Sequence, residues 1–128
     1  MTTTPLTLYG IPNCDTVKKA RAWLQAHGVA VVFHDFKKQG VPAAELATWT
    51  AALGWEKLIN RQGTTWRKLP TEQQAAVSDA ASAQALALAQ PSVIKRPVVA
   101  WPSTAGVTYT VGFDTEAWTT HLAALPVR

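Results

Sequence analysis

The stretch LTLYGIPNCDTVKKAR, Leu6–Arg21, decides the fold that we predict for this chain. Its first residues form a short apolar run that includes an aromatic residue, as strands do. Gly10 and Pro12 end that run. From Val17 onward, apolar residues recur at helical spacing. The stretch therefore predicts a strand, a tight loop and the start of a helix.

The only cysteine of the chain, Cys14, lies where this loop meets the helix. The first N–H groups of a helix have no partner within it, and the helix dipole is positive there. Both favour a thiolate, so we predict that Cys14 is a nucleophile of lowered pKa; the alternative is a small buried hydrophobic residue. Asn13 and Asp15 suit the N-cap position, and backbone N–H groups near Asp15 and Thr16 would hold the thiolate. Val17 stands where a Cys-x-x-Cys motif would have its second cysteine, so an outside thiol must resolve any disulfide.

Val29–Phe36 is predicted to form the second strand, because it is largely apolar and β-branched. A run of this kind is typical of a central strand that is covered on both faces. A strand, a helix and a strand in succession form a right-handed βαβ unit with parallel strands. Lys37–Pro42 is predicted to be a loop.

Residues 43–90 are predicted to form an all-helical insert. Ala43–Leu53 has apolar residues at helical spacing, and Gly54 stops it. Thr71 and Gln74 form a capping-box pattern. The expected helical pieces are 43–53, 55–60, 66–69, a helix from 71 and the alanine-rich 80–89, which begins at Ser78 or Asp79.

The last part of the chain is predicted to be a hairpin and a helix. Val98–Trp101 and Val107–Val111 pair as strands, and Asp114 or Thr115 caps a helix over Glu116–Leu125. The order β-α-β, helical insert, β-β-α is that of a thioredoxin-like α/β fold. We expect one domain over residues 1–128, with 43–90 as a subdomain.

The composition narrows the classes of protein that fit. The chain has 128 residues and a net charge of +4, which suits one soluble globular domain. No apolar run approaches the ~20 residues that span a bilayer, and Met1–Pro5 lacks the features of a signal peptide. The lack of a signal peptide and the single cysteine together predict a cytoplasmic protein. The small size of the chain predicts a monomer. The dispersed basic residues are typical of a solvated surface with no special partner. The alternative is attraction for an anion, such as glutathione, a small oxyanion or an acidic protein, and no motif indicates nucleic acid. The histidines lack metal-ligand spacing, so no metal site is expected.

Two arginines are candidates for binding an anion. Arg96 precedes Pro97 at the start of the third predicted strand. In a thioredoxin-like fold, the residue that enters this strand faces the thiol, and the X-Pro bond there is commonly cis. The planar fork of donors on Arg96 suits a carboxylate or an oxyanion; the alternatives are a surface arginine and a trans strand-edge proline. Arg61 lies beside Gly63 in a loop with two threonines, which could bind an anion or be solvated.

Three motifs together resemble the arsenate reductase/Spx (ArsC-like) family, and its YffB branch most. They are YGIPNCDTVKKA at Tyr9–Ala20, NRQGTTWRKL at Asn60–Leu69 and IKRPVV at Ile94–Val99. The resemblance implies a thioredoxin-like core with a helical insert and Cys14 as the active thiol. In the glutaredoxin-coupled reductases of this family, a cysteine at this place attacks arsenate, three arginines bind the oxyanion, and glutathione then forms a mixed disulfide. Arg61 and Arg96 match two of these arginines, whereas the third falls near Gly112, where this chain has none.

The resemblance therefore implies a glutathione-dependent thiol reductase in which Cys14 forms a mixed disulfide. Glutathione would be a co-substrate rather than a bound cofactor, glutaredoxin or another thiol would close the cycle, and the substrate would be a small oxyanion or an oxidised thiol. The alternative is a non-enzymatic, Spx-like regulatory module that binds RNA polymerase. The residues expected to contact substrate or glutathione are Arg61, Arg96, Pro97, Asn13, Asp15 and Thr16.

Overall fold

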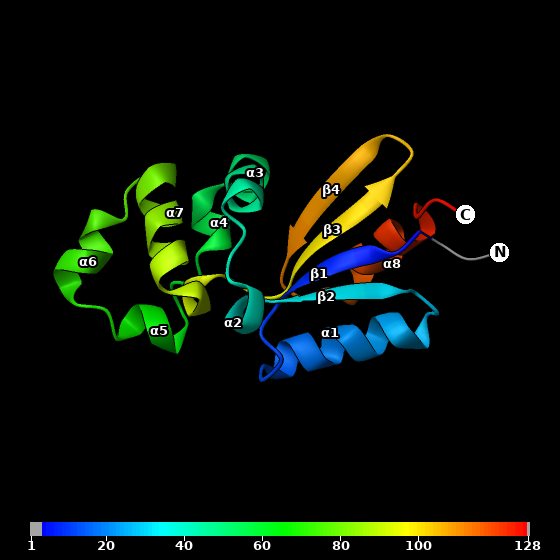
Figure 1. Cartoon of the computed structure of the whole chain (residues 1–128), viewed down its shortest axis with the longest axis horizontal. Coiled ribbons are helices and arrows are strands. Elements are labelled where there is room, and N and C mark those ends of the chain that lie inside the picture. The colour runs from blue at the N-terminus through cyan, green and yellow to red at the C-terminus, as the bar shows by residue number, and fades with distance from the viewer. Residues whose placement is uncertain (1–3, 128) are drawn as a thin grey trace. The chain divides into compact units, whose positions relative to one another are not determined.

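A computed structural model describes residues 4–127 of the chain. The chain divides into two compact units (Figure 1). The sheet unit comprises the residues up to Asp35 and those from Arg96 onward, and the helical unit comprises Phe36–Lys95. Met1–Thr3, which belong to the segment predicted not to be a signal peptide, lie outside the described residues. The interpretation of the chain as one domain with an insert over 43–90 stays a prediction.

The sheet unit contains a four-stranded mixed sheet in the order β2-β1-β3-β4. Strand β1 is parallel to β2 and antiparallel to β3, and β3 is antiparallel to β4. The central position predicted for the second strand is wrong, because β2 lies at the edge and leaves Val32 57% exposed. The strands span Leu6–Gly10 (β1), Val31–Asp35 (β2), Val98–Ser103 (β3) and Gly106–Val111 (β4).

Two helices, α1 (Asp15–Ala26) and α8 (Thr115–Ala123), pack on one face of this sheet. One buried cluster joins residues of β1 and β3 to both helices. Its centre is Trp118, whose ring lies 5.1 Å from that of Trp101 and 4.9 Å from that of Phe113. The other members of the cluster are Leu6, Leu8, Val17, Ala20, Leu24, Val29, Val99 and Leu125.

The C-terminal helix begins where the sequence predicts. Asp114 is the N-cap of α8, and its side chain accepts hydrogen bonds from the N–H groups of Glu116 and Ala117. Beyond this helix the chain returns to the start of β1. There the N–H of Thr4 donates to the carbonyl of Pro126 at 2.8 Å and its hydroxyl to the same oxygen at 3.1 Å.

The helical unit is built from short helices. The predicted loop after the second strand is wrong in part, because Phe36 turns inward and begins a one-turn helix. The predicted capping box at Thr71 is also wrong: Pro70 is the N-cap, and the Gln74 side chain donates to the carbonyl of Trp66. The helices are α2 (Phe36–Gln39), α3 (Ala43–Leu53), α4 (Trp55–Leu58), α5 (Thr64–Arg67), α6 (Thr71–Ala76), α7 (Ala80–Ala89) and the 3₁₀ turn η1 (Pro91–Val93).

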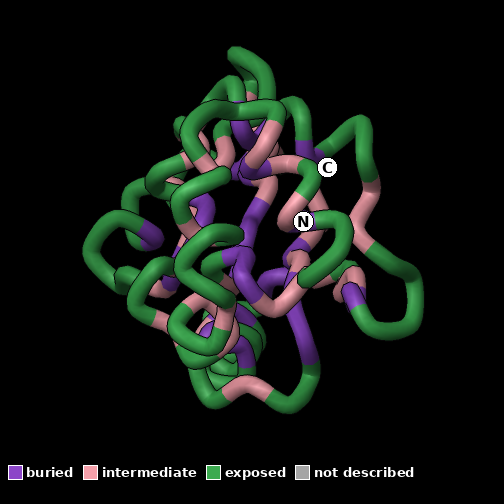
Figure 2. The backbone as a smooth tube through the Cα atoms, turned by 90° about the vertical axis from the view of Figure 1, so that its left-hand side faces the viewer, coloured by how far each residue is buried: buried purple, intermediate pink, exposed green. Residues whose placement is uncertain are grey.

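The longest helix of this unit after α3 has the start that the sequence predicts. Asp79 is the N-cap of α7 and forms a reciprocal capping box with Ser82. The buried residues of the unit lie on α2, α3, α4, α7 and the segments that follow α4 and α7, and appear as purple parts of the backbone in Figure 2. They include Phe36, Leu46, Trp49, Leu58, Ile59, Ala83, Ala87, Val93 and Ile94. Within residues 4–127, no helix is long and apolar enough to cross a membrane.

Candidate active site

Cys14 lies in the sheet unit, between the end of β1 and the start of α1. It is the N-cap residue of α1, with an extended backbone, so neither of the predicted caps, Asn13 and Asp15, occupies that position. Gly10 permits this tight connection, because a Cβ there would meet Cγ2 of Val17 at 2.9 Å. The absence of a side chain at the strand end thus lets the first turn of α1 approach β1.

Arg96 reaches the same edge of the sheet from the other end of the sequence. In the antiparallel pair β1 and β3, Tyr9 pairs with Val98, so the last residues of β1 lie beside the first residues of β3. Arg96 stands two residues before Val98. The Arg96–Pro97 peptide bond is cis, the geometry that is common at this place in a thioredoxin-like fold.

The charges and N–H groups around Cys14 favour its ionised form. Partial burial raises the pKa of the thiol, but stronger combined effects lower it: the N–H of Val17, the hydrogen bond and positive charge of Arg96, and the N–H of Thr16. The pKa of Cys14 is therefore lowered from its ordinary value.

The sulfur is placed to react with a molecule from outside. Cys14 is half-buried, and Pro12, Asn13, Asp15 and Thr16 around it are exposed. A half-buried thiolate beside a guanidinium can attack a disulfide sulfur or another electrophile. Because this is the only cysteine of the chain, the resulting adduct has no internal thiol to release it. The described residues contain no cluster of three or more His, Cys, Asp or Glu side chains that could hold a metal ion.

The structure adds one residue that the sequence did not indicate. Phe113 follows Gly112 after β4 and packs, like Cys14, against the buried cluster. Pro97 is buried, and its carbonyl accepts a hydrogen bond from the N–H of Gly112 at 2.9 Å. Phe113 carries no polar group and belongs to no motif, so its packing against the cluster that also supports Cys14 follows only from the fold.

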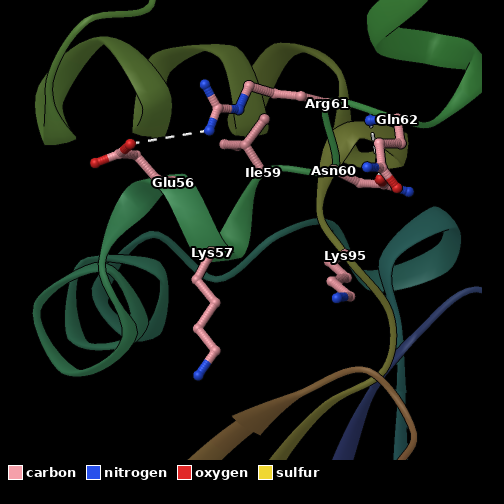
Figure 3. Close-up of a pocket in the computed structure, with 7 residues that line it drawn as sticks. All are labelled: Glu56, Lys57, Ile59, Asn60, Arg61, Gln62 and Lys95. Carbon is pink, nitrogen blue, oxygen red and sulfur yellow. Dashed lines mark hydrogen bonds and ion pairs between the residues drawn. The ribbon is translucent and has the colours of Figure 1, made fainter.

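Arg61, the other predicted anion ligand, belongs to the helical unit. Its guanidinium lies 3.8 Å from a carboxylate oxygen of Glu56 and 5.7 Å from the ring centre of Trp55. It lines a hollow of this unit, shown in Figure 3. The structure thus joins Cys14 to Arg96 in one unit and places Arg61 in the other.

Comparisons with known proteins agree with this arrangement. A solved YffB protein has a TM-score of 0.82 and 48% identity, covering 91% of this chain and 98% of its own. The solved arsenate reductase (ArsC) related protein from Brucella melitensis has a TM-score of 0.69 and 46% identity, covering 93% and 95%. An uncharacterised protein of Haemophilus influenzae is 39% identical over 73% of this chain and 82% of its own length.

These relatives confirm the predicted thioredoxin-like fold and the resemblance to the YffB branch. The family model described as "ArsC family" matches residues 9–121, a range that includes Cys14, Arg61 and Arg96. The chain therefore belongs to the ArsC family.

Proposed function

We propose that this protein is a glutathione-linked thiol reductase with Cys14 as its nucleophile. The observation that carries the proposal is the position of the half-buried Cys14 at the N-cap of α1 and beside Arg96, an arrangement that lowers the pKa of the thiol. Membership of the ArsC family and 46% identity to an arsenate reductase related protein support it. Arg96 would stabilise the attacking thiolate and contact the anionic groups of the substrate or of glutathione.

The reaction can be written with one sulfur of this chain. The Cys14 thiolate attacks the glutathione sulfur of a mixed disulfide R–S–S–G, the S–S bond breaks, and R–S⁻ leaves and takes up a proton. Cys14 now carries glutathione. A second glutathione thiolate attacks this adduct, releases Cys14 as a thiolate and forms oxidised glutathione. The net reaction is R–S–S–G + GSH → R–SH + GSSG, so the thiol of R is regenerated at the cost of one free glutathione, which becomes half of the oxidised glutathione.

The remaining parts of the proposal concern the setting of this reaction. We expect glutathione as a co-substrate with no bound cofactor, glutaredoxin as an alternative resolving thiol, and a monomer in the cytoplasm. The segment around Gly112 contains no arginine that could form a third contact to an oxyanion. We therefore expect oxidised thiols, rather than arsenate, to be the main substrate.

The test is the intact mass of the full chain after exposure to oxidised glutathione. We expect one glutathionyl group to be added to the wild type and none to Cys14→Ser, and reduced glutathione to remove it. An arsenate turnover assay runs beside it, with no turnover expected. A wild-type chain that takes up no glutathionyl group at pH 8 would contradict the proposal.

The regulatory alternative, a partner-binding module without turnover, stays a prediction. It requires that partner binding does not depend on the thiol. If Cys14→Ser retains the biological effect of the protein in cells, the reductase proposal fails and the binding module remains.

A further inference from the structure

We propose that the outer edge of β2 and the neighbouring side of α1 bind an extended acidic segment of a partner protein, which adds to the sheet as a fifth strand. This docking surface lies entirely within the sheet unit. It consists of the outward backbone groups of β2, the Arg21 side chain and a recess beside them. The recess encloses about 470 Å³ including its open mouth, and its lining residues are Arg21, Gln25, Val29 and Val31.

The outer edge of β2 carries backbone groups with which no strand of residues 4–127 pairs. β2 is the outermost strand of the sheet and has β1 on its other side (Figure 1). The N–H of Leu6 donates to the carbonyl of Ala30, and Leu6 is in register with Val31. Because backbone groups alternate along a strand, those of Val32 face β1, whereas those of Val31 and Phe33 face outward. An extended segment can therefore pair with Val31 and Phe33.

This edge lacks the features that usually keep an exposed strand from pairing with another chain. A proline, a lysine or a β-bulge commonly has this role. The strand has the sequence VVFHD, and its residues pair with β1 in an unbroken register. Its charged residue, Asp35, is the last of the strand and is buried. The edge is therefore open to pairing, and the exposed Val32 offers an apolar side chain to an added strand.

Arg21 gives this edge a positive charge. The Cζ atom of its guanidinium lies 4.2 Å from the ring centre of Phe33, which holds the side chain next to β2. Stacking uses the flat face of a guanidinium and leaves its N–H groups available at the rim. Within the described part of the chain, Arg21 has no carboxylate partner. A carboxylate of the added segment would form a bidentate contact there.

The charge of α1 favours an acidic partner over a second copy of this chain. The helix carries three cations, Lys18, Lys19 and Arg21, against the single carboxylate of Asp15. Lys18 and Arg21 are three residues apart, so they are neighbours on the helix surface. An antiparallel pair of β2 edges from two copies would place both α1 helices on one face, where these cations repel each other. A segment with carboxylates is attracted instead.

The recess sets the side-chain pattern of the segment. Successive side chains of a strand alternate between the two faces of the sheet. Every second side chain of the added strand would therefore face Arg21 and the recess, and the others would lie beside Val32. We expect carboxylates in the first set and apolar side chains in the second.

The position of the docking surface relates it to Cys14. The parallel strands β1 and β2 end together at Gly10 and Asp35, and Cys14 follows the end of β1. An added strand would lie two strand spacings, about 10 Å, from β1. Residues that flank the docked segment would then lie at the end of the sheet that carries the thiol. This last step rests on the proposed function, and it makes the oxidised thiol substrate a protein.

The experiment measures the binding of a model segment to the full chain. The probe is the acetylated and amidated peptide EVEVEVE, which has no cysteine, and its matched control is KVKVKVK. Calorimetry measures the affinity, and hydrogen exchange by NMR follows the amides of Val31 and Phe33. The test variant is Arg21→Gln, and the control is Lys19→Gln, which removes the same charge from the opposite side of α1. Both residues are exposed, and melting temperatures check that both variants fold.

We expect the glutamate peptide to slow the exchange of the Val31 and Phe33 amides, and to bind Arg21→Gln roughly fivefold more weakly than Lys19→Gln. The lysine peptide should bind the wild type roughly tenfold more weakly than the glutamate peptide. Equal weakening in both variants, equal binding of both peptides, or protection of residues 107–111 in β4 instead would overturn the inference. Slower exchange of the same amides at high protein concentration without peptide would also overturn it, because a second copy would then occupy the edge.

The docking surface and the reductase proposal fail separately. If the glutamate peptide binds as expected but Cys14 takes up no glutathionyl group in the mass experiment, the reductase proposal fails and the docking surface stands. If Cys14 takes up the group but the peptide does not bind, the docking surface fails and the reductase proposal stands.

A glutathionylated cysteine added to either end of both peptides tests the link between the two proposals. The wild type should remove glutathione faster from the glutamate peptide than from the lysine peptide, and Arg21→Gln should lose this difference. Equal rates for the two peptides in the wild type would overturn the assignment of a docked protein as the substrate.

Discussion

The two units of this protein place their functional side chains in different ways. In the sheet unit, Cys14 and Arg96 are far apart in sequence and meet because β1 and β3 pair antiparallel. In the helical unit, Arg61, Lys57 and Glu56 are near neighbours in sequence and project from one exposed segment. The comparison indicates that the reacting atom is fixed by long-range packing, whereas Glu56, Lys57 and Arg61 of the hollow depend on local structure.

The largest expected effect is on the core of each unit. Trp118→Ala and Trp49→Ala each remove a fully buried indole, so each should lower the free energy of unfolding by about 3–5 kcal/mol. Of these two tryptophans, only Trp118 belongs to the buried cluster against which Cys14 packs. We therefore expect only Trp118→Ala to shift the pH midpoint of Cys14 alkylation, toward the ~8.5 of free cysteine. Denaturant unfolding measures the loss of stability, and alkylation rates measure the pH midpoint. An equal shift of the alkylation midpoint in Trp49→Ala would contradict the proposed difference between the two units.

A smaller effect is expected from a single added methyl group. In Gly10→Ala the new Cβ meets the buried, β-branched Val17 at 2.9 Å, so the first turn of α1 must move. We expect a loss of about 1–3 kcal/mol of stability and slower alkylation of Cys14. In Gly63→Ala the Cβ meets the end of the Asn60 side chain at 2.9 Å, which can turn away. Its loss should be smaller, and Cys14 should react as in the wild type; the same cost in both variants would contradict this account.

The third prediction concerns the two arginines. Arg96 lowers the pKa of Cys14 through its hydrogen bond and its charge, so Arg96→Gln should raise that pKa. Arg96→Lys should retain part of the charge effect. Alkylation at pH 7 should slow several-fold in Arg96→Gln, since the thiolate is the reacting form. Arg61→Gln, made in the helical unit, is the control and should leave the rate unchanged.

The smallest expected effect is on the pH dependence of stability. The contribution of Cys14 in the sheet unit changes at alkaline pH, whereas that of Asp79 in the helical unit changes in acid. The folded state lowers the pKa of Cys14, so its contribution is complete above the unfolded value of ~8.5 and is lost as pH falls through the folded pKa. The Asp79 pKa is lowered by hydrogen bonds from Ser82. Its contribution is present above the unfolded value of ~3.9 and is lost in acid as pH falls through the folded pKa.

Unfolding free energies between pH 2 and 9 test this. Cys14→Ser should flatten the rise of stability toward alkaline pH and leave the acid side unchanged, whereas Asp79→Ala should flatten the acid side only. A wild-type chain whose stability does not rise toward pH 9 would show that the thiol is not stabilised as a thiolate.

Most helices and strands could be predicted because their periodicity and end residues agree. The starts of α7 and α8 at Asp79 and Asp114 are such cases. The edge position of β2 could not be predicted, because an apolar run looks the same whether one face or both are covered. The capping box predicted at Thr71 does not form, because Pro70 occupies the N-cap position and the Gln74 side chain donates its hydrogen bond to the carbonyl of Trp66.

The candidate site was predictable to a similar degree. A lone cysteine between a strand and a helix indicated Cys14, and the fold expectation indicated its neighbour Arg96. Phe113 could not be found, since only the folded sheet unit packs it against the same buried cluster as Cys14. The hollow of the helical unit could not be predicted either, since Lys95 lies in the same lining as Lys57 only because Ile59 and Ile94 form a bridge.

The two bonds between Thr4 and Pro126 have a consequence for protein engineering. They hold the described ends of the chain side by side, so a short glycine-serine linker could connect them. New termini could then be opened at the exposed Thr104–Ala105 turn between β3 and β4. Such a circular permutant would keep every strand pairing around the thiol, and a fusion partner would then be attached at the β3–β4 turn rather than at the present ends.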